Sequence, residues 1–180
     1  NGLSKEAYYF IGGLMKHSKA MTAITNPLIN SYKRLCSGYE APAYIAWSST
    51  NRSMLIRIPA GSGFNTRIEL RSPDSAANPY LTLALCLAAG MDGIRNKILP
   101  PQSVEENIAL LSEAELIQRG VEPLPMNLLE AVTEMKKDPF IRQVLGDHVT
   151  DKFIAAKEEE WKEYSTQVSQ WEIDQYLARI

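Results

Sequence analysis

The residues with the clearest chemical potential are the charged side chains of the segment Arg67-Ile-Glu-Leu-Arg71. If this segment is a β-strand, the alternation of its side chains sends Arg67, Glu69 and Arg71 to one face. A carboxylate is a ligand for divalent cations, and guanidinium groups bind phosphates and carboxylates. The pattern therefore favours a site for a metal ion beside an anionic substrate. An ordinary solvated sheet face with weak ion pairs is the alternative.

Arginines are concentrated around this segment. Nine occur in the chain, and five of them, with Lys33, fall between positions 33 and 71, against only Glu40 and Glu69. The five are Arg34, Arg52, Arg57, Arg67 and Arg71. Arginine suits planar, bidentate recognition of phosphate or carboxylate. Because the chain has a net charge of −2 and no recognisable nucleic-acid-binding motif, a small polyanionic substrate is favoured over a nucleic acid.

Length and composition set further limits. A chain of 180 residues with 45% hydrophobic content can form one domain, or part of a larger one. Cys36 and Cys86 lack any CxxC spacing, which fits a reducing, cytoplasmic setting. His17 and His148 lack ligand-like companions and are expected to be helix or surface residues. No apolar run is long enough to span a membrane. The start at Asn1 indicates a piece of a longer protein.

The elements that would position the arginines are short strands, expected at about 44–47, 53–58 and 66–71. Gly61-Ser-Gly63 is expected to turn the chain between the last two strands. Before them, Ser4 predicts the cap of a first helix, in which Gly12-Gly13 indicates a close contact with another helix or strand. From Asn26 to about residue 42 the pattern predicts an irregular polar loop.

Helices dominate the rest of the pattern. Asn78-Pro79 predicts the start of a helix that runs to Lys97 and, being apolar nearly all round, is expected to be buried on most sides. Further helices are expected near 104–118, 127–137, 139–146 and 150–176, the last carrying Trp161 and Trp171 as anchors in the core or on a partner subunit. The predicted fold class is α+β, with an incomplete antiparallel sheet packed with several helices and a long C-terminal helix.

Several strings occur in an order and spacing that resemble glutamine synthetase of the bacterial type I. They are Asn26-Pro, Asn30-Ser-Tyr-Lys-Arg34, Gly38-Tyr-Glu-Ala-Pro42, Asn51-Arg-Ser53, Ile56-Arg-Ile-Pro59, Arg67-Ile-Glu-Leu-Arg71, Pro73-Asp, Ala77-Asn-Pro-Tyr80, Leu87 to Lys97, and Thr166-Gln-Val-Ser-Gln-Trp-Glu. The resemblance covers essentially the whole chain. It implies the C-terminal part of that family's catalytic domain, whose barrel the predicted sheet would help to form.

The resemblance implies a chemistry and a role for each matched residue. ATP phosphorylates the side-chain carboxylate of L-glutamate, and ammonia displaces phosphate from the γ-glutamyl phosphate to give glutamine. Mg²⁺ or Mn²⁺ assists at the phosphates. By resemblance, Glu69 is a metal ligand, and Arg57 and Arg67 bind the nucleotide. Arg34 and Arg71 bind the carboxylates of glutamate, and Arg52 contacts both ATP and glutamate and stabilises the transferring phosphoryl group. Glu40 belongs to the substrate site and lies on a flap that closes it and helps to deprotonate ammonium.

Two departures bear on regulation. Asn65 lies near the place of a nucleotide-binding lysine in the family's enteric branch, so that contact is in doubt. Ala109 aligns with the tyrosine that is adenylylated in the same branch. The chain therefore resembles the branch that is controlled by feedback inhibition and protein partners.

The family's N-terminal β-grasp domain, its other metal-binding glutamates and its ammonium pocket have no counterpart here. The isolated chain is therefore expected to be inactive, and its parent to be a cytoplasmic dodecamer of two hexamers. Two alternatives remain open: a ligase of the same fold that joins glutamate to a polyamine or another amine, and a non-catalytic assembly module.

Overall fold

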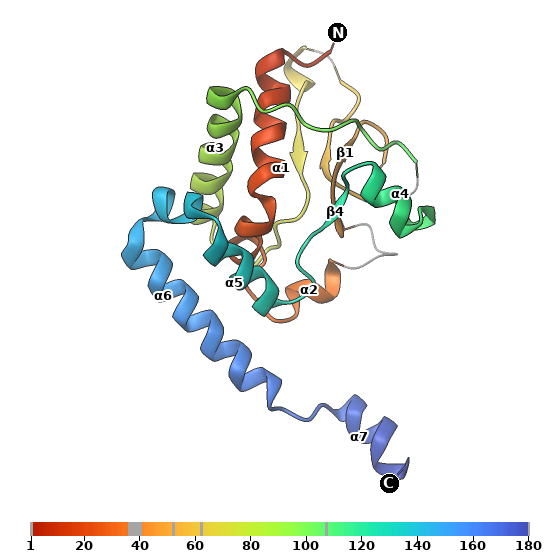
Figure 1. Ribbon diagram of the computed structural model, residues 1–180, viewed down its shortest axis with the longest axis vertical. Coiled ribbons are helices and arrows are strands. Elements are labelled where there is room, and N and C mark those ends of the chain that lie inside the picture. Colours follow the sequence, from red (N-terminus) through yellow and green to blue (C-terminus); the bar gives the residue numbers. More distant parts are fainter. Residues whose placement is uncertain (1, 36–40, 52, 62, 107, 180) are drawn as a thin grey trace.

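The computed structural model describes residues 2–35, 41–51, 53–61, 63–106 and 108–179. Helix α1 (Lys5–Thr25) is central, α3 (Pro79–Asn96) lies beside it, and α5 (Leu128–Lys137) packs near its C-terminal end (Figure 1). A small sheet lies on the other side of α1, and α6 (Pro139–Ser165) extends away from this body. The predicted α+β class with a long C-terminal helix is confirmed.

The sheet has four strands in the order β3-β2-β1-β4. They are β1 (Tyr44–Ser48), β2 (Met54–Arg57), β3 (Glu69–Leu70) and β4 (Glu122–Pro123). The pairs β2–β3 and β1–β4 are antiparallel, as predicted, but β1 and β2 run parallel. Only residues 49–53 connect these two strands. Parallel neighbours usually need a connection of about a dozen residues or more. The parallel pairing was therefore unexpected for a link of this length.

Strand β3 is shorter than the strand predicted at 66–71. It covers Glu69 and Leu70, and a hydrogen bond of 2.9 Å from Arg71 N to Leu55 O extends the ladder by one residue. The connection from β2 contains a 3₁₀ helix, η1 (Gly63–Asn65), in place of a simple hairpin turn. The strand pair β2–β3 is thus a wide hairpin.

The sheet separates two hydrophobic clusters. In β1, Ile45 belongs to the main cluster with Ile11, Ile24 and Leu128, whereas Ala46 belongs to a smaller cluster with Met54, Val104, Ile108, Leu116 and Val121. Alternate residues of a strand face opposite sides, which explains how neighbours join different clusters. Both faces of β1 and β2 are therefore covered, and their positions are fixed by packing.

The first helix follows its sequence signals. The Ser4 side chain caps α1 by accepting a hydrogen bond from Ala7 N. The predicted close contact at Gly12-Gly13 is confirmed, because a Cβ on Gly13 would lie 2.0 Å from the carbonyl oxygen of Ala89 in α3. The approach is equally close at Gly93 in α3, where a Cβ would lie 2.0 Å from Tyr9 O in α1. Any larger side chain at these positions would separate α1 from α3.

The predicted burial of α3 on most sides is wrong within the part of the chain that the structure describes. Asn78 caps the helix as expected, but the buried residues form a single stripe, Leu85, Ala89, Gly90 and Gly93. Tyr80, Leu83 and Leu87 are 84%, 61% and 60% exposed. The stripe packs on α1, and no described element covers the opposite side.

The remaining helices match the pattern in part. Helix α5 confirms the prediction at 127–137, and Gly146, with φ of +77°, interrupts α6 where the pattern separates two helices. The helix predicted at 104–118 is wrong in its first half, since only η2 (Ile108–Leu110) and α4 (Glu113–Gln118) are helical. The shorter elements are α2 (Ser31–Arg34), α7 (Gln170–Tyr176) and η3 (Leu177–Arg179).

The predicted helix at 150–176 is divided. Helix α6 ends at Ser165, and a new capping box formed by Ser169 and Glu172 begins α7. Trp161 packs against the main cluster, while Trp171 is 62% exposed. Across the described residues, every helix is too short or too polar to cross a lipid bilayer.

Candidate functional site

Glu69 lies between two guanidinium groups at the edge strand of the sheet. Its Oε2 is 3.0 Å from Arg57 Nη2, and its Oε1 is 2.9 Å from Arg67 Nη2 and 3.0 Å from Arg67 Nε. The register of β2 and β3 explains the first contact, because Arg57 and Glu69 are directly opposite each other. We call Arg57, Arg67 and Glu69 the arginine site.

The arginine site carries more positive than negative charge. Two guanidinium groups face one carboxylate, so one positive charge is left over. Among the described residues, no acceptor meets the buried Nε of Arg57. A buried donor without an acceptor is costly unless a ligand supplies one. The arrangement is therefore suited to bind a further anion such as phosphate.

Arg34 lies beside the chain just after β3. Its Nη2 donates to Asn26 Oδ1 at 3.1 Å and also to the carbonyl oxygen of Ser72. Its Nε is a second buried donor without an acceptor in the described part of the chain. Arg71 directly precedes Ser72, so the two arginines predicted to bind glutamate belong to neighbouring parts of the fold. They adjoin the arginine site through the short strand β3.

Two of the predicted site residues are catalytic. Glu40 and Arg52 lie outside the described residues, as do Cys36 and most of the Gly38-to-Pro42 motif. The structure thus brings together Arg57, Arg67 and Glu69, and connects Arg34 to the segment that carries Arg71. The roles of all seven residues remain predictions.

A complete metal site is not formed by the described residues. Within them, no group of three or more His, Cys, Asp or Glu side chains lies close enough to hold a metal ion. Glu69 alone is available at the arginine site, and both of its oxygens contact guanidinium groups. Mg²⁺ and Ca²⁺ take about six or more oxygen ligands. This donor set does not fit a divalent cation unless further ligands come from elsewhere.

A pocket of about 500 Å³ adjoins Arg67. Ile68, Phe10 and Ile94 give it an apolar wall, and Arg67 and Glu6 contribute charged groups to its lining. An apolar wall beside a cation can accept a ligand that has both a flat or aliphatic part and an anionic part. The start of α1 supplies most of the other lining residues, so this helix also shapes the surroundings of the arginine site.

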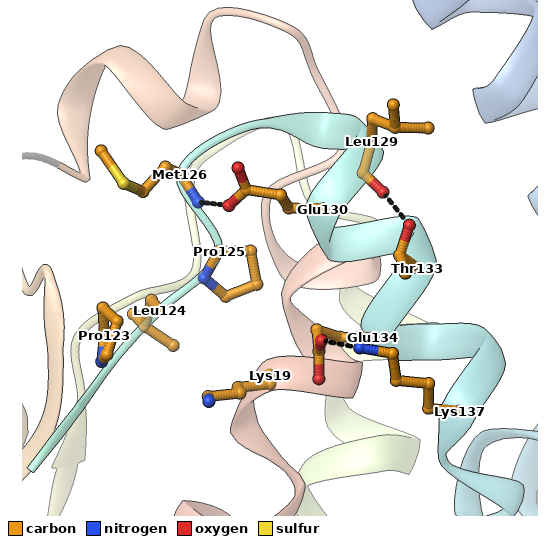
Figure 2. Close-up of a pocket in the computed structure, with 10 residues that line it drawn as sticks. All are labelled: Lys19, Pro123, Leu124, Pro125, Met126, Leu129, Glu130, Thr133, Glu134 and Lys137. Atoms are coloured by element: carbon orange, nitrogen blue, oxygen red, sulfur yellow. Dashed lines mark hydrogen bonds and ion pairs between the residues drawn. The ribbon is translucent and has the colours of Figure 1, made fainter.

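A second pocket, of about 370 Å³, lies between the chain after β4 and helix α5 (Figure 2). Its charged residues already have partners: Lys19 contacts Glu122 at 2.7 Å, Lys137 contacts Glu134 at 2.6 Å, and Glu130 accepts from Met126 N at 2.8 Å. The other lining residues are mainly apolar. Since its charges are balanced internally, this pocket is a weaker candidate for a charged substrate than the arginine site.

Sequence reasoning missed the residues that hold the arginines in place. Asn26 and the carbonyl of Ser72 fix Arg34, and the carbonyl of Asn65 accepts from Arg67 Nη1 at 3.2 Å. Backbone carbonyl partners have no signature in side-chain type, so the sequence could not reveal two of these three contacts. The pair Asn26-Pro27 was the one signal in the sequence, and it indicates a helix end in its own right.

Comparisons with known proteins place this geometry in a family. A family model described as "Glutamine synthetase, catalytic domain" matches residues 1–176. Glutamine synthetases of Thermotoga maritima and Clostridium saccharobutylicum are 56% and 54% identical over 98% and 99% of this chain. The chain spans 40% of the length of each of these two relatives.

Solved structures agree with the sequence comparison. A GmaS–ADP complex superposes with a TM-score of 0.84 at 39% identity, covering 98% of this chain and 40% of that one. Ligand-free GmaS gives 0.80 at the same identity. With the family model covering nearly all residues, the chain belongs to the glutamine synthetase catalytic-domain family.

Proposed function

We propose that this chain forms the C-terminal part of the catalytic domain of a glutamate–ammonia ligase. The parent protein joins ammonia to L-glutamate at the expense of ATP and forms L-glutamine through γ-glutamyl phosphate. The observation that carries the proposal is the arginine site, in which two guanidinium groups surround Glu69 and leave one positive charge for an anionic ligand. The identity of 54–56% to glutamine synthetases supports the choice of reaction.

The proposed roles follow from charge and position. Arg57 and Arg67 bind phosphate oxygens of the nucleotide, because phosphoryl transfer requires fixed cations around the developing negative charge. Arg34 and Arg71 bind the carboxylates of glutamate. Arg52 stabilises the transferring phosphoryl group, and Glu40 closes the site and accepts a proton from ammonium. These last two roles rest on the sequence motifs alone.

The proposed metal ligand is Glu69. When bound, Mg²⁺ or Mn²⁺ neutralises charge on the phosphates. A single carboxylate cannot hold such an ion, so the remaining ligands belong to a part of the parent protein that precedes this segment. The β-grasp domain and the first part of the catalytic domain would belong there too. The 180-residue chain by itself is therefore expected to be inactive.

The proposed assembly is a cytoplasmic dodecamer of two hexamers, regulated by feedback inhibition and protein partners. The separate helix α7 supports oligomer formation. Its main neighbour among the described elements is η3, and it exposes Trp171 and Leu177. Exposed aromatic and aliphatic side chains on a detached segment are typical of a docking surface.

An assay of glutamine formation tests the proposal. The full-length protein and the 180-residue chain are each incubated with ATP, Mg²⁺, L-glutamate and ammonium. We expect turnover by the full-length protein and none above background by the shorter chain. A parallel reaction with putrescine in place of ammonium tests the amine-ligase alternative. Faster reaction with putrescine, or no ligase activity with either amine, would contradict the proposed function.

A further inference from the structure

The short link between β1 and β2 requires an unusual anchor. Residues 49–53 must carry the chain from the end of one strand back to the start of its parallel neighbour. No crossover helix fits into five residues, so the backbone amides of Ser49, Thr50 and Asn51 lack the partners that regular structure provides. Side chains must supply the missing acceptors.

Ser48 Oγ accepts from the backbone amides of Thr50 and Asn51 at 3.1 and 2.9 Å, and Glu105 supplies further acceptors from a distant part of the chain. Its Oε2 accepts from Ser48 Oγ at 2.6 Å and from Thr50 Oγ1 at 2.7 Å. Its two oxygens also accept from the backbone amides of Ser49 and Thr50, each at 3.2 Å, and Ser49 Oγ donates at 3.2 Å. One carboxylate thus accepts five hydrogen bonds from three successive residues.

The segment that carries Glu105 makes further contacts with the same link. Trp47 Nε1 donates to Pro101 O at 2.7 Å, and Asn51 Nδ2 donates to the Glu106 carbonyl at 2.8 Å. This segment is the connection that crosses from α3 toward α4 in Figure 1. It therefore contacts the chain before and after the three residues that donate to the Glu105 carboxylate.

The link is directly connected to the arginine site. Ser48, which donates to Glu105, is the register partner of Arg57 in the parallel pair, and its carbonyl accepts from Ile58 N at 2.9 Å. Arg57 in turn contacts Glu69. A change in the position of Ser48 is thus transmitted through one strand pair to the guanidinium group that faces Glu69.

We propose that Glu105 is a positioning residue for the proposed ligase reaction. Its carboxylate binds Ser48, Ser49 and Thr50, and this contact keeps β2 in the register that brings Arg57 to Glu69. The expected effect on activity rests on the proposed function. The hydrogen bonds between Glu105 and residues 48–50 are independent of it. Glu105 touches no residue of the arginine site, so it acts only through Ser48 and β2.

The carboxylate chemistry is specific. An ionised carboxylate is acceptor-only, whereas an amide offers one acceptor and two donors. In Glu105→Gln, an NH₂ group would face hydroxyl and amide donors and break several of the five hydrogen bonds. In Glu105→Asp both acceptor oxygens remain, although the side chain is one methylene shorter. The aspartate should therefore keep much of the function that the glutamine loses.

The test compares these variants in the full-length protein, with Glu106→Gln as the matched control. Glu106 is the next residue, and its side chain contacts Arg119 and not the link. We expect Glu105→Gln to lower kcat/KM for ATP by about tenfold to a hundredfold, because small displacements of a binding group have effects of that size. KM for ATP should rise while KM for glutamate stays within about twofold, since Arg57 is on the proposed nucleotide side. A purely structural role would lower the amount of active enzyme without raising KM for ATP.

Hydrogen exchange at the amides of Ser49 and Thr50, which donate to Glu105, provides a second readout. Glu105→Gln should accelerate it, and Glu105→Asp should restore both exchange and activity to within about threefold of the wild type. Equal KM for ATP in Glu105→Gln and Glu106→Gln would overturn the proposal, as would unchanged exchange. If Glu105→Gln does not fold, Thr50→Val, which removes one hydroxyl donor to Glu105, replaces it in the comparison of KM for ATP, and a value equal to that of Glu106→Gln again overturns the proposal. If the wild type forms no glutamine, the proposed function fails, and the exchange measurement still decides whether Glu105 holds the link.

Discussion

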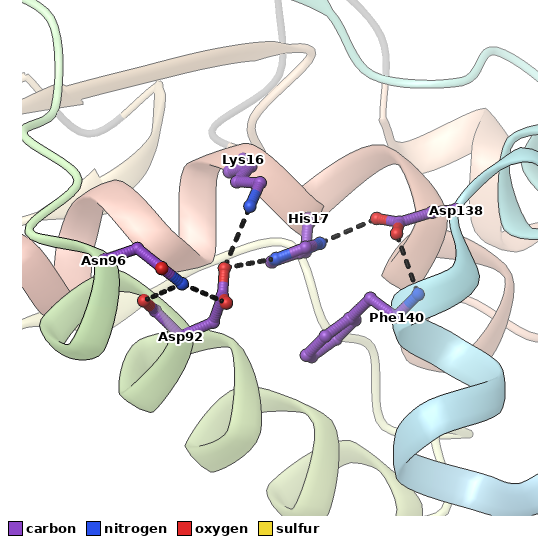
Figure 3. Close-up of polar contacts among 6 residues, drawn as sticks. All are labelled: Lys16, His17, Asp92, Asn96, Asp138 and Phe140. Carbon is purple, nitrogen blue, oxygen red and sulfur yellow. Dashed lines mark hydrogen bonds and ion pairs between the residues drawn. The ribbon is translucent and has the colours of Figure 1, made fainter.

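Two polar clusters in this protein use the same kinds of side chain with opposite results. The arginine site has two cations and one carboxylate. A second cluster, formed by Lys16, His17, Asp92, Asn96 and Asp138, joins α1, α3 and α6, and we call it the histidine cluster (Figure 3). The first leaves charge unmatched at an edge strand, and the second pairs its polar groups around the buried ring of His17. The difference distinguishes a ligand site from a structural connection.

The histidine cluster is complete within the chain. His17 Nδ1 is 2.7 Å from Asp138 Oδ2, and its Nε2 is 3.0 Å from Asp92 Oδ2. Both ring nitrogens thus face carboxylate oxygens, and Lys16 Nζ donates to Asp92 Oδ2 at 3.0 Å. The ring stacks on Phe140 at a centroid distance of 3.9 Å. Each group therefore has a partner, and none is left for a ligand.

The largest expected effect is on stability, from His17→Ala. The side chain of His17 is only 5% exposed, and its loss leaves Asp92 and Asp138 without their contacts to the ring. We expect the free energy of unfolding to fall by about 3 kcal/mol, because a packed side chain and two hydrogen bonds are lost together. Urea denaturation followed by circular dichroism measures it. Lys16→Ala is the control, and since its side chain is 51% exposed it should cost less than about 1 kcal/mol. Equal losses in both variants would remove the contrast between the clusters.

The second effect is on activity, from Glu69→Gln in the full-length protein. Removing the carboxylate charge should lower kcat by about a hundredfold, because the proposed metal ligand is lost. Stability should change by less than about 1 kcal/mol, because the contacts of Glu69 are partly exposed. Steady-state kinetics and thermal unfolding measure the two quantities. A large loss of stability with little loss of activity would show that the arginine site is structural.

The third effect is on acid stability. Hydrogen bonding from His17 lowers the pKa of Asp92, against the opposing effect of its partial burial. A carboxylate with a lowered folded pKa contributes stability above its unfolded pKa of about 3.9, and this stability is lost as the pH falls below that value. Asp92→Asn should therefore flatten the dependence of unfolding free energy on pH below about 4, measured by urea denaturation at several pH values. A slope as steep as in the wild type would exclude this contribution.

Glu105 contributes to the same acid range. Burial raises its pKa, but hydrogen bonds from Ser48, Thr50, Ser49 and Ser103 outweigh burial and bring the pKa to about 2. The sign is the same as for Asp92, so its contribution is present above about 4.3 and is lost as the pH falls toward 2. The amides of Ser49 and Thr50 should exchange faster, relative to the intrinsic rate at each pH, as the pH approaches 2. Constant protection across this range would contradict the assignment.

The smallest effect on the folding of this chain is expected from Trp171→Ala. Helix α7 is separate from the body, and Trp171 contacts mainly Tyr176 at a ring distance of 5.8 Å. The free energy of unfolding of the 180-residue chain should change by less than about 0.5 kcal/mol. Assembly of the full-length protein should be weakened, as measured by sedimentation velocity. Intact assembly would exclude Trp171 as an oligomer anchor.

Much of the fold could be predicted because its signals are local. Ser4 and Asn78 cap the helices that they were expected to cap, and the Gly12-Gly13 pair correctly indicates the close approach of α1 to α3. Capping depends on side chains within three residues, and glycine removes the one atom that would prevent close packing. The charged residues around Glu69 could be found for a similar reason, since strand alternation is itself a local property.

Contacts between distant residues could not be predicted. The parallel pairing of β1 and β2 depends on Glu105, more than fifty residues away from the link that it holds. His17 was expected to be an ordinary helix or surface residue because its partners, Asp92 and Asp138, lie far away in the sequence. Helix α3 was expected to be buried on most sides because it is apolar nearly all round. Apolar composition does not show which side of a helix packs against another element.

The sequence by itself determined the chemistry of this protein: the types of charged residue between positions 34 and 71, their order, and the family to which they belong. Tertiary structure decided which charges cancel. Asp92 and Asp138 pair with His17 and Lys16, whereas Glu69 leaves an excess of positive charge with Arg57 and Arg67. The reason is that charge compensation acts over a few ångströms in space, and separation along the chain does not report that distance.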